Sequence, residues 1–220
     1  LEREKSVEDC LNEHFVEWQQ KGWLPDMRIE PGAETTRLFL ERGWTHWHHL
    51  FNPRQLLTGA LIRQESEAGL CIALARQINQ NSRISRWDPA SGGGGCVQAA
   101  FDNQALNTLF NYGCRASENF SDLICKSTKN YPLLEDVTLQ VASIPADSIE
   151  VHNDIYVTDP PYGDAVNYHE ILDFFIAWLR KNPPPEFAGW IWDSRRSLAI
   201  KGEDEDFRRS MVAAYRRMTE

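Results

Sequence analysis

Near the N-terminus apolar residues recur at every third or fourth position, which is the spacing of one face of an α-helix: Val7, Leu11, Phe15 and Trp18. Asn52 followed by Pro53 combines a good N-cap residue with a first-turn proline, so a helix is expected to begin there. The pattern as a whole predicts helices from Ser6 to Gly22, over 36–41, from Pro53 onward and after a cap at Ser66.

Two more helices are predicted towards the C-terminus. Segment 167–181, NYHEILDFFIAWLRK, is amphipathic, and the tail from Glu203 to Met218 also has a helical pattern. Three consecutive prolines, 183–185, should stop the first of these helices. Its predicted buried face consists of Tyr168, Ile171, Leu172, Phe175 and Leu179.

Strand patterns are rarer. Segment 136–143, DVTLQVAS, alternates apolar and polar residues as a half-buried strand does, and 154–158, DIYVT, has the β-branched and aromatic content of a short buried strand. Segment 97–112 favours a helix or mixed structure. Strands followed by helices indicate an α/β layer with a large helical portion. Since two strands make a poor sheet, either further strands exist or the chain is one part of a larger sheet.

The best internal boundary is a polar stretch over 79–95 that ends in four glycines. It divides the chain into a helical N-terminal region (1–82), a glycine-rich loop with a helical connector (83–130), and a region carrying the two strand patterns (131–220).

Composition narrows the class of protein. No run of apolar residues is long enough to cross a membrane, the N-terminus is charged, and five cysteines follow no metal or disulfide spacing. These features predict reduced thiols in a cytoplasmic protein without a structural metal. The net charge of −9 argues against a simple basic coat for nucleic acid, although it leaves room for a local basic groove.

Several aromatic residues allow two interpretations. His46, His48 and His49 lie close together, but no carboxylate or cysteine at ligand spacing accompanies them, so core or interface positions are favoured over a metal site. Tryptophans are usually buried, yet exposed ones can stack on nucleobases. The tryptophans in question are Trp44, Trp47, Trp190 and Trp192.

The strongest chemical signal is Asp159-Pro160-Pro161-Tyr162, directly after the second strand pattern. Adjacent prolines fix the backbone and remove two N–H donors, which leaves carbonyl and carboxylate acceptors beside an aromatic face. Such a corner suits a planar base with an exocyclic amine: Asp159 and the Pro160 carbonyl accept its hydrogens, and Tyr162 stacks on the ring. A proline-stiffened turn is the alternative, but this tetrapeptide arises by chance in only about one chain in a thousand.

At these residues the chain resembles the amino-methylating DNA methyltransferases, and in particular the adenine-specific DNA methylase family that carries the uncharacterised domain DUF1156. Segment 158–181 is similar to the family's motif IV and its flank, and HHLFNPRQLL (48–57) to an upstream segment. The flank matches at Asp164, Val166, Tyr168, Asp173, Phe174, Phe175, Trp178 and Leu179; the upstream segment matches at Phe51, Arg54, Gln55 and Leu56.

The resemblance implies a Rossmann-like fold of the S-adenosylmethionine-dependent (class I) methyltransferases, here with a partial sheet. It implies that Phe51, Asn52 and Arg54 touch the cofactor's methionine end, with Ser143 near its adenosine; ordinary core packing is the alternative for Phe51 and Leu56. DPASGGGG (88–95) has the look of the cofactor loop, but the weak strand before it favours a plain flexible loop. Since the last strands of such a sheet are missing, we expect the chain to be part of a larger protein.

The predicted function is therefore transfer of a methyl group from S-adenosylmethionine to an amine of DNA, with adenine N6 favoured. Two alternatives remain open at this point. Asp-Pro-Pro-Tyr followed by Gly163 also occurs in RNA methyltransferases that act on guanine N2. A non-catalytic nucleic-acid-binding or scaffold module of a modification or defence complex is the alternative outside enzymes.

Overall fold

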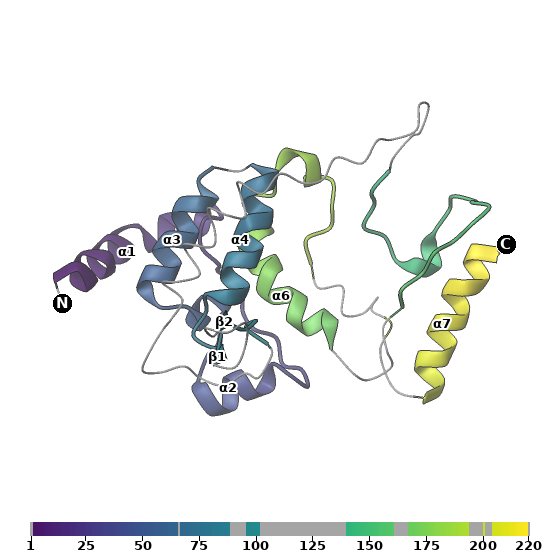
Figure 1. Ribbon diagram of the computed structural model, residues 1–220, viewed down its shortest axis with the longest axis horizontal. Helices are drawn as coiled ribbons and strands as arrows, with labels where there is room; N and C mark the ends of the chain where they lie inside the picture. The colour runs from purple at the N-terminus through teal and green to yellow at the C-terminus, as the bar shows by residue number, and fades with distance from the viewer. Residues whose placement is uncertain are drawn as a thin grey trace.

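The computed structural model describes residues 2–65, 67–88, 96–101, 140–160, 167–193, 200 and 204–219, and Figure 1 shows that these are mainly helical. The α-helices are α1 (Glu2–Gln20), α2 (Thr36–Arg42), α3 (Pro53–Arg63), α4 (Ala68–Gln80), α6 (Tyr168–Leu179) and α7 (Asp204–Thr219). Short 3-10 helices are η1 (Trp47–Leu50), η3 (Ala146–Ser148) and η4 (Pro185–Phe187). None of the helices in these ranges is long and apolar enough to span a bilayer.

The predicted α/β fold with a partial Rossmann-like sheet is wrong for the described part of the chain. Its one sheet is an antiparallel pair of two-residue strands, β1 (Trp87–Asp88) and β2 (Cys96–Val97). A methyltransferase sheet needs several parallel strands joined by helices. Helices α1, α3, α4 and α6 instead pack around one hydrophobic core.

The strand predicted over 154–158 shows why. Ile155 is 80% exposed and Val157 is 95% exposed, and the segment has no regular secondary structure. A strand with a buried face is stabilised by side-chain packing against neighbours, so β-branched composition alone does not make one. Of the other predicted strand, residues 140–143 are irregular and exposed, and 136–139 lie outside the described residues.

The core joins α1, α3, α4 and α6 with the loop around η1 (Figure 1). Its largest side chains are aromatic: Trp47 and Phe174 are fully buried, and Trp178 is nearly so. Trp47 meets Phe174 edge-on with ring centroids 6.0 Å apart. Helix α6 therefore shares one core with helices that lie far from it in the sequence, the nearest of which, α4, ends at Gln80.

Most predicted helices are confirmed, with small shifts at their ends. Helix α3 begins at Pro53 as expected, since Asn52 Oδ1 accepts the Gln55 N–H at 2.9 Å and Gln55 Oε1 accepts the Asn52 N–H at 2.8 Å. This reciprocal pair is a capping box, which satisfies backbone donors that the first turn leaves free. Helix α1 starts earlier than predicted, and α6 ends at Leu179, before the three prolines.

Helix α6 turns a different face to the core from the predicted one. Its buried residues are Glu170, Asp173, Phe174, Ala177 and Trp178. Tyr168 and Leu172, from the predicted face, are each 49% exposed. The helix is apolar around most of its circumference, so periodicity alone did not determine which stripe faces inward. Phe174 and Trp178, which lie one turn apart, occupy the core.

Segment 140–160 runs beside α7, away from α3 and α4 (Figure 1). Helix α7 contacts η3 within this segment, and Ala214 is buried at 3% exposure. The acidic first half of α7 pairs with arginines one turn on: Glu205 with Arg208 and Asp206 with Arg209. These exposed pairs contribute little to stability.

Close approach of α3 and α6 gives a first prediction. A Cβ at Gly59 would lie 2.4 Å from Cη2 of Trp178, whose indole is held in the core. Gly59→Ala gains up to about 1 kcal/mol in helix propensity, but overpacking of a rigid core costs about 1–3 kcal/mol. We expect a net loss in the free energy of unfolding, measured by urea denaturation. Gly69→Ala in α4 is the matched control, because its Cβ meets nothing within 4 Å, and it should be neutral or stabilising.

Candidate functional site

The candidate site is the motif Asp159–Tyr162 and its flanks. Asp159 is exposed and Pro160 is half-buried, at the end of a mostly exposed stretch without regular secondary structure. Pro161 and Tyr162 lie outside the described residues, as do Asp164 and Val166 of the flank. The carboxylate of Asp159 is therefore accessible from solvent, as a group that receives an amine must be.

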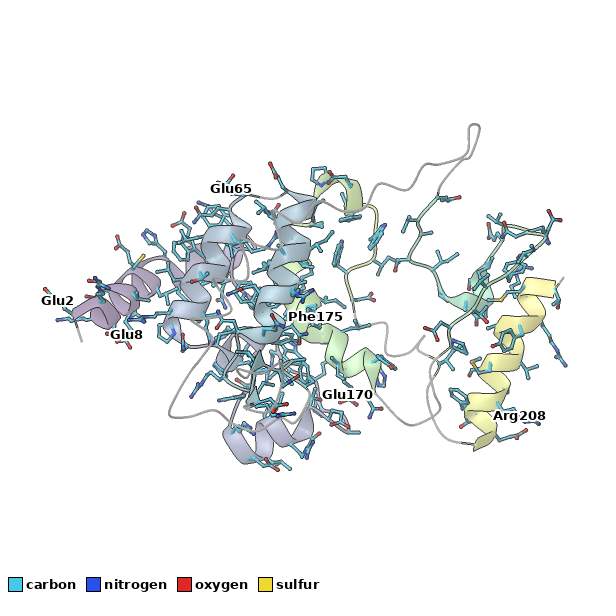
Figure 2. The ribbon with its side chains drawn as sticks, in the orientation of Figure 1. Glu2, Glu8, Glu65, Glu170, Phe175 and Arg208 are labelled. Atoms are coloured by element: carbon cyan, nitrogen blue, oxygen red, sulfur yellow. The ribbon has the colours of Figure 1, made fainter. Side chains whose placement is uncertain are left out.

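Glu170, in the first turn of α6 (Figure 2), links this helix to the loop before α2. Its Oε1 accepts the Ala33 N–H at 2.8 Å, and its Oε2 accepts the N–H groups of Glu34 at 2.9 Å and Thr35 at 3.1 Å. Burial alone raises the pKa of Glu170, but these hydrogen bonds outweigh burial and hold the pKa below its usual value. Glu170 is thus a buried, ionised carboxylate tied to the loop before α2.

The middle of α6 meets the segment that contains Phe51. The Phe51 ring stacks on Phe174 with centroids 5.5 Å apart and meets Trp178 edge-on at 5.2 Å. The two segments that resemble the methylase family, 48–57 and 158–181, therefore contact each other through these rings. Phe51 is 4% exposed, and its ring is enclosed by side chains of the core.

The C-terminal end of α6 is held by Arg63 of α3, whose side chain is fully buried. Its Nε donates to the carbonyl of Trp178 at 3.1 Å, one Nη donates to the carbonyl of Asn182, and the other lies 2.9 Å from Cys71 Sγ. Burial lowers the pKa of Arg63, yet a guanidinium stays protonated at neutral pH. Just beyond, Arg180 and Lys181 both pair with Asp26.

The residues predicted to touch S-adenosylmethionine do not converge. Asn52 Oδ1 is engaged in the capping box, and Arg54 points outward with a surface bond to Glu4. Ser143 is exposed and belongs to segment 140–160. That segment runs beside α7, away from α3 (Figure 1). With Phe51 in the core, these four residues do not form a shared cofactor site in the described part of the chain.

An open groove lies between α1 and α3. Its volume is about 620 Å³, and it is lined by Glu2, Arg3, Ser6, Val7, Arg54, Leu57 and Thr58. It reaches neither Asn52 nor the segment that leads to Asp159. Its lining is mixed and mostly charged or polar, so nothing about it selects a particular ligand.

The three clustered histidines lie between the core and the surface. His48 and His49 meet edge-on with ring centroids 4.4 Å apart, and His46 and His48 stack at 5.3 Å. Nδ1 of His48 lies 3.2 Å from the carbonyl of Pro25. Among the described residues, no group of histidine, cysteine or carboxylate side chains is arranged to hold a metal ion.

The histidine cluster predicts a pH dependence of stability. Burial, with help from His49 and His46, lowers the pKa of His48 to about 4. In the unfolded chain the pKa of His48 is near 6.5, so protonation of this residue favours the unfolded state. The contribution of neutral His48 to the free energy of unfolding is therefore fully present above about pH 6.5. It is lost as the pH falls towards 4. The full shift in the pKa of His48 corresponds to about 3 kcal/mol of unfolding free energy. Because His48 is partly exposed to solvent, the expected effect is about 1–2 kcal/mol.

Urea unfolding at neutral and mildly acidic pH measures this effect. His48→Gln should remove most of the pH dependence, whereas His152→Gln, at an exposed position in the segment beside α7, should leave it unchanged. Equal pH dependence in the wild type and in His48→Gln would contradict the assignment to His48.

The four tryptophans differ in their burial. Trp44 and Trp47 are buried. Trp190 and Trp192 are half-buried and stack with centroids 6.1 Å apart, while the Trp192 indole donates to the carbonyl of Phe187 at 3.1 Å.

Sequence reasoning missed Glu170, Arg63 and Gly59 as positioning groups. For Glu170, the available signal was a carboxylate in the first turn of a mostly apolar helix, because a carboxylate is seldom buried without partners.

No model of a known protein family matches the chain, and no curated protein and no solved structure is significantly similar to it.

Proposed function

We propose that this chain carries the amine-binding segment of a methyltransferase that acts on DNA, with adenine N6 as the acceptor. The observation that carries the proposal is the tetrapeptide Asp159-Pro160-Pro161-Tyr162. Few side-chain combinations offer a carboxylate, a carbonyl freed from backbone pairing and an aromatic face within four positions. An exocyclic amine on a planar ring needs all three.

The chemistry on the acceptor side follows from these groups. The Asp159 carboxylate accepts one amine hydrogen and the Pro160 carbonyl accepts the other, while Tyr162 stacks on the base. Two acceptors draw the nitrogen towards tetrahedral geometry, so that its lone pair is directed outward as a nucleophile. As the new N–C bond forms, the bond between the methyl group and the sulfur of S-adenosylmethionine breaks with its electron pair left on sulfur, and the nitrogen loses a proton to water. Positioning and electrostatic stabilisation supply most of the rate enhancement.

S-adenosylmethionine is the proposed co-substrate and supplies an electrophilic methyl group. Since Phe51, Asn52, Arg54 and Ser143 do not converge, this chain's contribution is limited here to binding and orienting the amine.

Two features of the described residues support the proposal. Asp159 is exposed, so a base can reach it. The helix that follows the motif packs on Phe51 through Phe174 and Trp178, which joins the two segments that resemble the methylase family. Neither feature depends on a parallel sheet.

The test is a transfer assay with the full protein and isotope-labelled S-adenosylmethionine. Duplex DNA, single-stranded DNA and RNA of matched sequence are offered, and the methylated base is identified by mass spectrometry. We expect label in the adenine of DNA. Label in RNA alone would favour the RNA methyltransferase alternative. Absence of transfer, together with no heat of cofactor binding by calorimetry, would refute an enzymatic role and favour a binding module.

A further inference from the structure

Four basic side chains lie together at the surface of the helical body, although the chain as a whole carries a net charge of −9. This basic cluster consists of Arg28, His46, His49 and Arg83. Arg28 is exposed, and it pairs with His46 in an antiparallel β-bridge. Residues directly opposite each other in such a bridge have side chains on the same face, with Cβ atoms about 4.5–5.5 Å apart. The His46 ring meets the His49 ring edge-on with centroids 5.6 Å apart, and one Nη of Arg83 donates to the carbonyl of His49 at 3.3 Å.

Two members of the basic cluster are held in place by the fold. The guanidinium carbon of Arg83 lies 5.1 Å from the ring centroid of the buried Trp44. The backbone N–H of Thr45 donates to Nδ1 of His49 at 3.1 Å. A ring nitrogen that accepts a hydrogen bond carries a lone pair, so the proton of neutral His49 lies on Nε2. Burial, with help from His46 and Arg83, lowers the pKa of His49 and thereby favours this neutral form. His49 Nε2 is thus an N–H donor.

No carboxylate neutralises the two arginines of the basic cluster within the part of the chain that the structure describes. Asp26, which lies near Arg28 in the sequence, pairs with Arg180 and Lys181. Neither Arg28 nor Arg83 has an acidic side chain within ion-pair distance among the described residues. An anion beside these guanidinium groups would supply the missing opposite charge. The basic cluster is therefore complementary to an anionic ligand.

We propose that the basic cluster binds a phosphate group of a nucleic-acid backbone. A guanidinium matches phosphate oxygens with paired donors, and Arg28 and Arg83 supply one each. His49 adds a neutral N–H donor. Because Arg28 is exposed and the other three residues are half-buried, the cluster is an open surface, which suits a polymer backbone better than a free ion. No residue of the motif Asp159–Tyr162 takes part, and only the choice of DNA as the nucleic acid rests on the proposed function.

Binding of the full chain to a fluorescently labelled DNA duplex, followed by anisotropy at several salt concentrations, tests this site. Arg28→Gln and Arg83→Gln each remove one guanidinium. We expect each to weaken binding about fivefold to tenfold near 0.1 M salt and to reduce the slope of log K against log salt by about one. Arg209→Gln in α7 is the matched control, because it removes the same charge from an exposed pair with Asp206, and it should change neither quantity.

Circular dichroism shows whether each variant is folded. Arg28 is exposed, so its replacement leaves the core intact even if loss of the Arg83 contacts destabilises the chain. Affinity and salt slope unchanged from the wild type in Arg28→Gln would overturn the proposal. Polyglutamate and inorganic phosphate serve as competitors. Displacement of the duplex by polyglutamate as readily as by unlabelled DNA would overturn the assignment to phosphate, and binding of inorganic phosphate without binding of the duplex would overturn the assignment to nucleic acid.

The same variants separate this site from the proposed function. DNA binding that depends on Arg28 and Arg83, in a protein that transfers no methyl group, would refute the proposed function and support the basic cluster. Methyl transfer to DNA with wild-type affinity in both variants would support the proposed function and refute the basic cluster.

Discussion

Replacing Asp159 by alanine should lower kcat for DNA methylation by about a hundredfold to a thousandfold while leaving the fold intact. Loss of one preorganised group that stabilises developing charge has effects of this size in other enzymes. Asp159 is exposed and outside the hydrophobic core, so its removal should not change thermal unfolding. The expected result is therefore a loss of kcat without a loss of stability, measured by label transfer and by circular dichroism on the same samples.

Two further variants sharpen this test. Asp159→Asn keeps one oxygen acceptor but loses the negative charge, so its kcat should lie between those of the wild type and the alanine variant. Asp154→Ala removes an exposed carboxylate of the same segment, five positions earlier, and should keep full activity. Full activity in Asp159→Ala would remove this carboxylate from the mechanism.

The helices could be predicted where local rules decide them. Asn52 and Pro53 specify the start of α3 through capping geometry, which depends on neighbours within one turn. The tail helix α7, at Asp204–Thr219, follows from its periodic pattern in the same way. These features involve no distant partner, so the sequence contains what is needed to infer them.

The sheet could not be predicted from local rules. Segment 154–158 has the composition of a strand, but a strand requires a neighbour that supplies hydrogen bonds and packing, and Val157 is almost fully exposed. The identity of a neighbour depends on the whole fold. Composition alone therefore gave the wrong fold class.

The inward face of α6 shows the same limit at the level of side chains. Its buried carboxylate, Glu170, is stabilised by N–H groups of residues 33–35, far away in sequence. A pattern of apolar positions treats a glutamate as solvent-facing. It assigned Tyr168 and Leu172 to the core in its place, and both are half exposed. The proposed amine-binding motif, by contrast, could be picked out from the sequence because its four residues are adjacent.

Replacing Arg63 by methionine should cause the largest loss of stability among the variants considered. The guanidinium donates to carbonyls of Trp178 and Asn182 at the C-terminal end of α6, in a position where its side chain is fully buried. Methionine matches the aliphatic part of the arginine side chain but has no donor, so the carbonyl oxygens of Trp178 and Asn182 would lose their partner. Each such group costs about 1–3 kcal/mol, which gives a total of about 2–6 kcal/mol for the two.

A competing effect works in the opposite direction, since removing a buried charge also removes its desolvation penalty. That penalty is recovered in full only where apolar groups replace both partners of the hydrogen bond. Here the carbonyls remain, because they belong to the backbone of the helix end, so we expect the loss to dominate.

The melting temperature should fall by about 5–15 °C, given the usual entropy of unfolding for a chain of this size. Arg63→Lys keeps the charge but not the planar fork of donors, and should fall in between. Arg54→Met in the same helix removes an exposed arginine with a surface partner and should change the unfolding free energy by no more than about 1 kcal/mol. If Arg63→Met melted no lower than Arg54→Met, the guanidinium would not be what holds the end of α6 against α3.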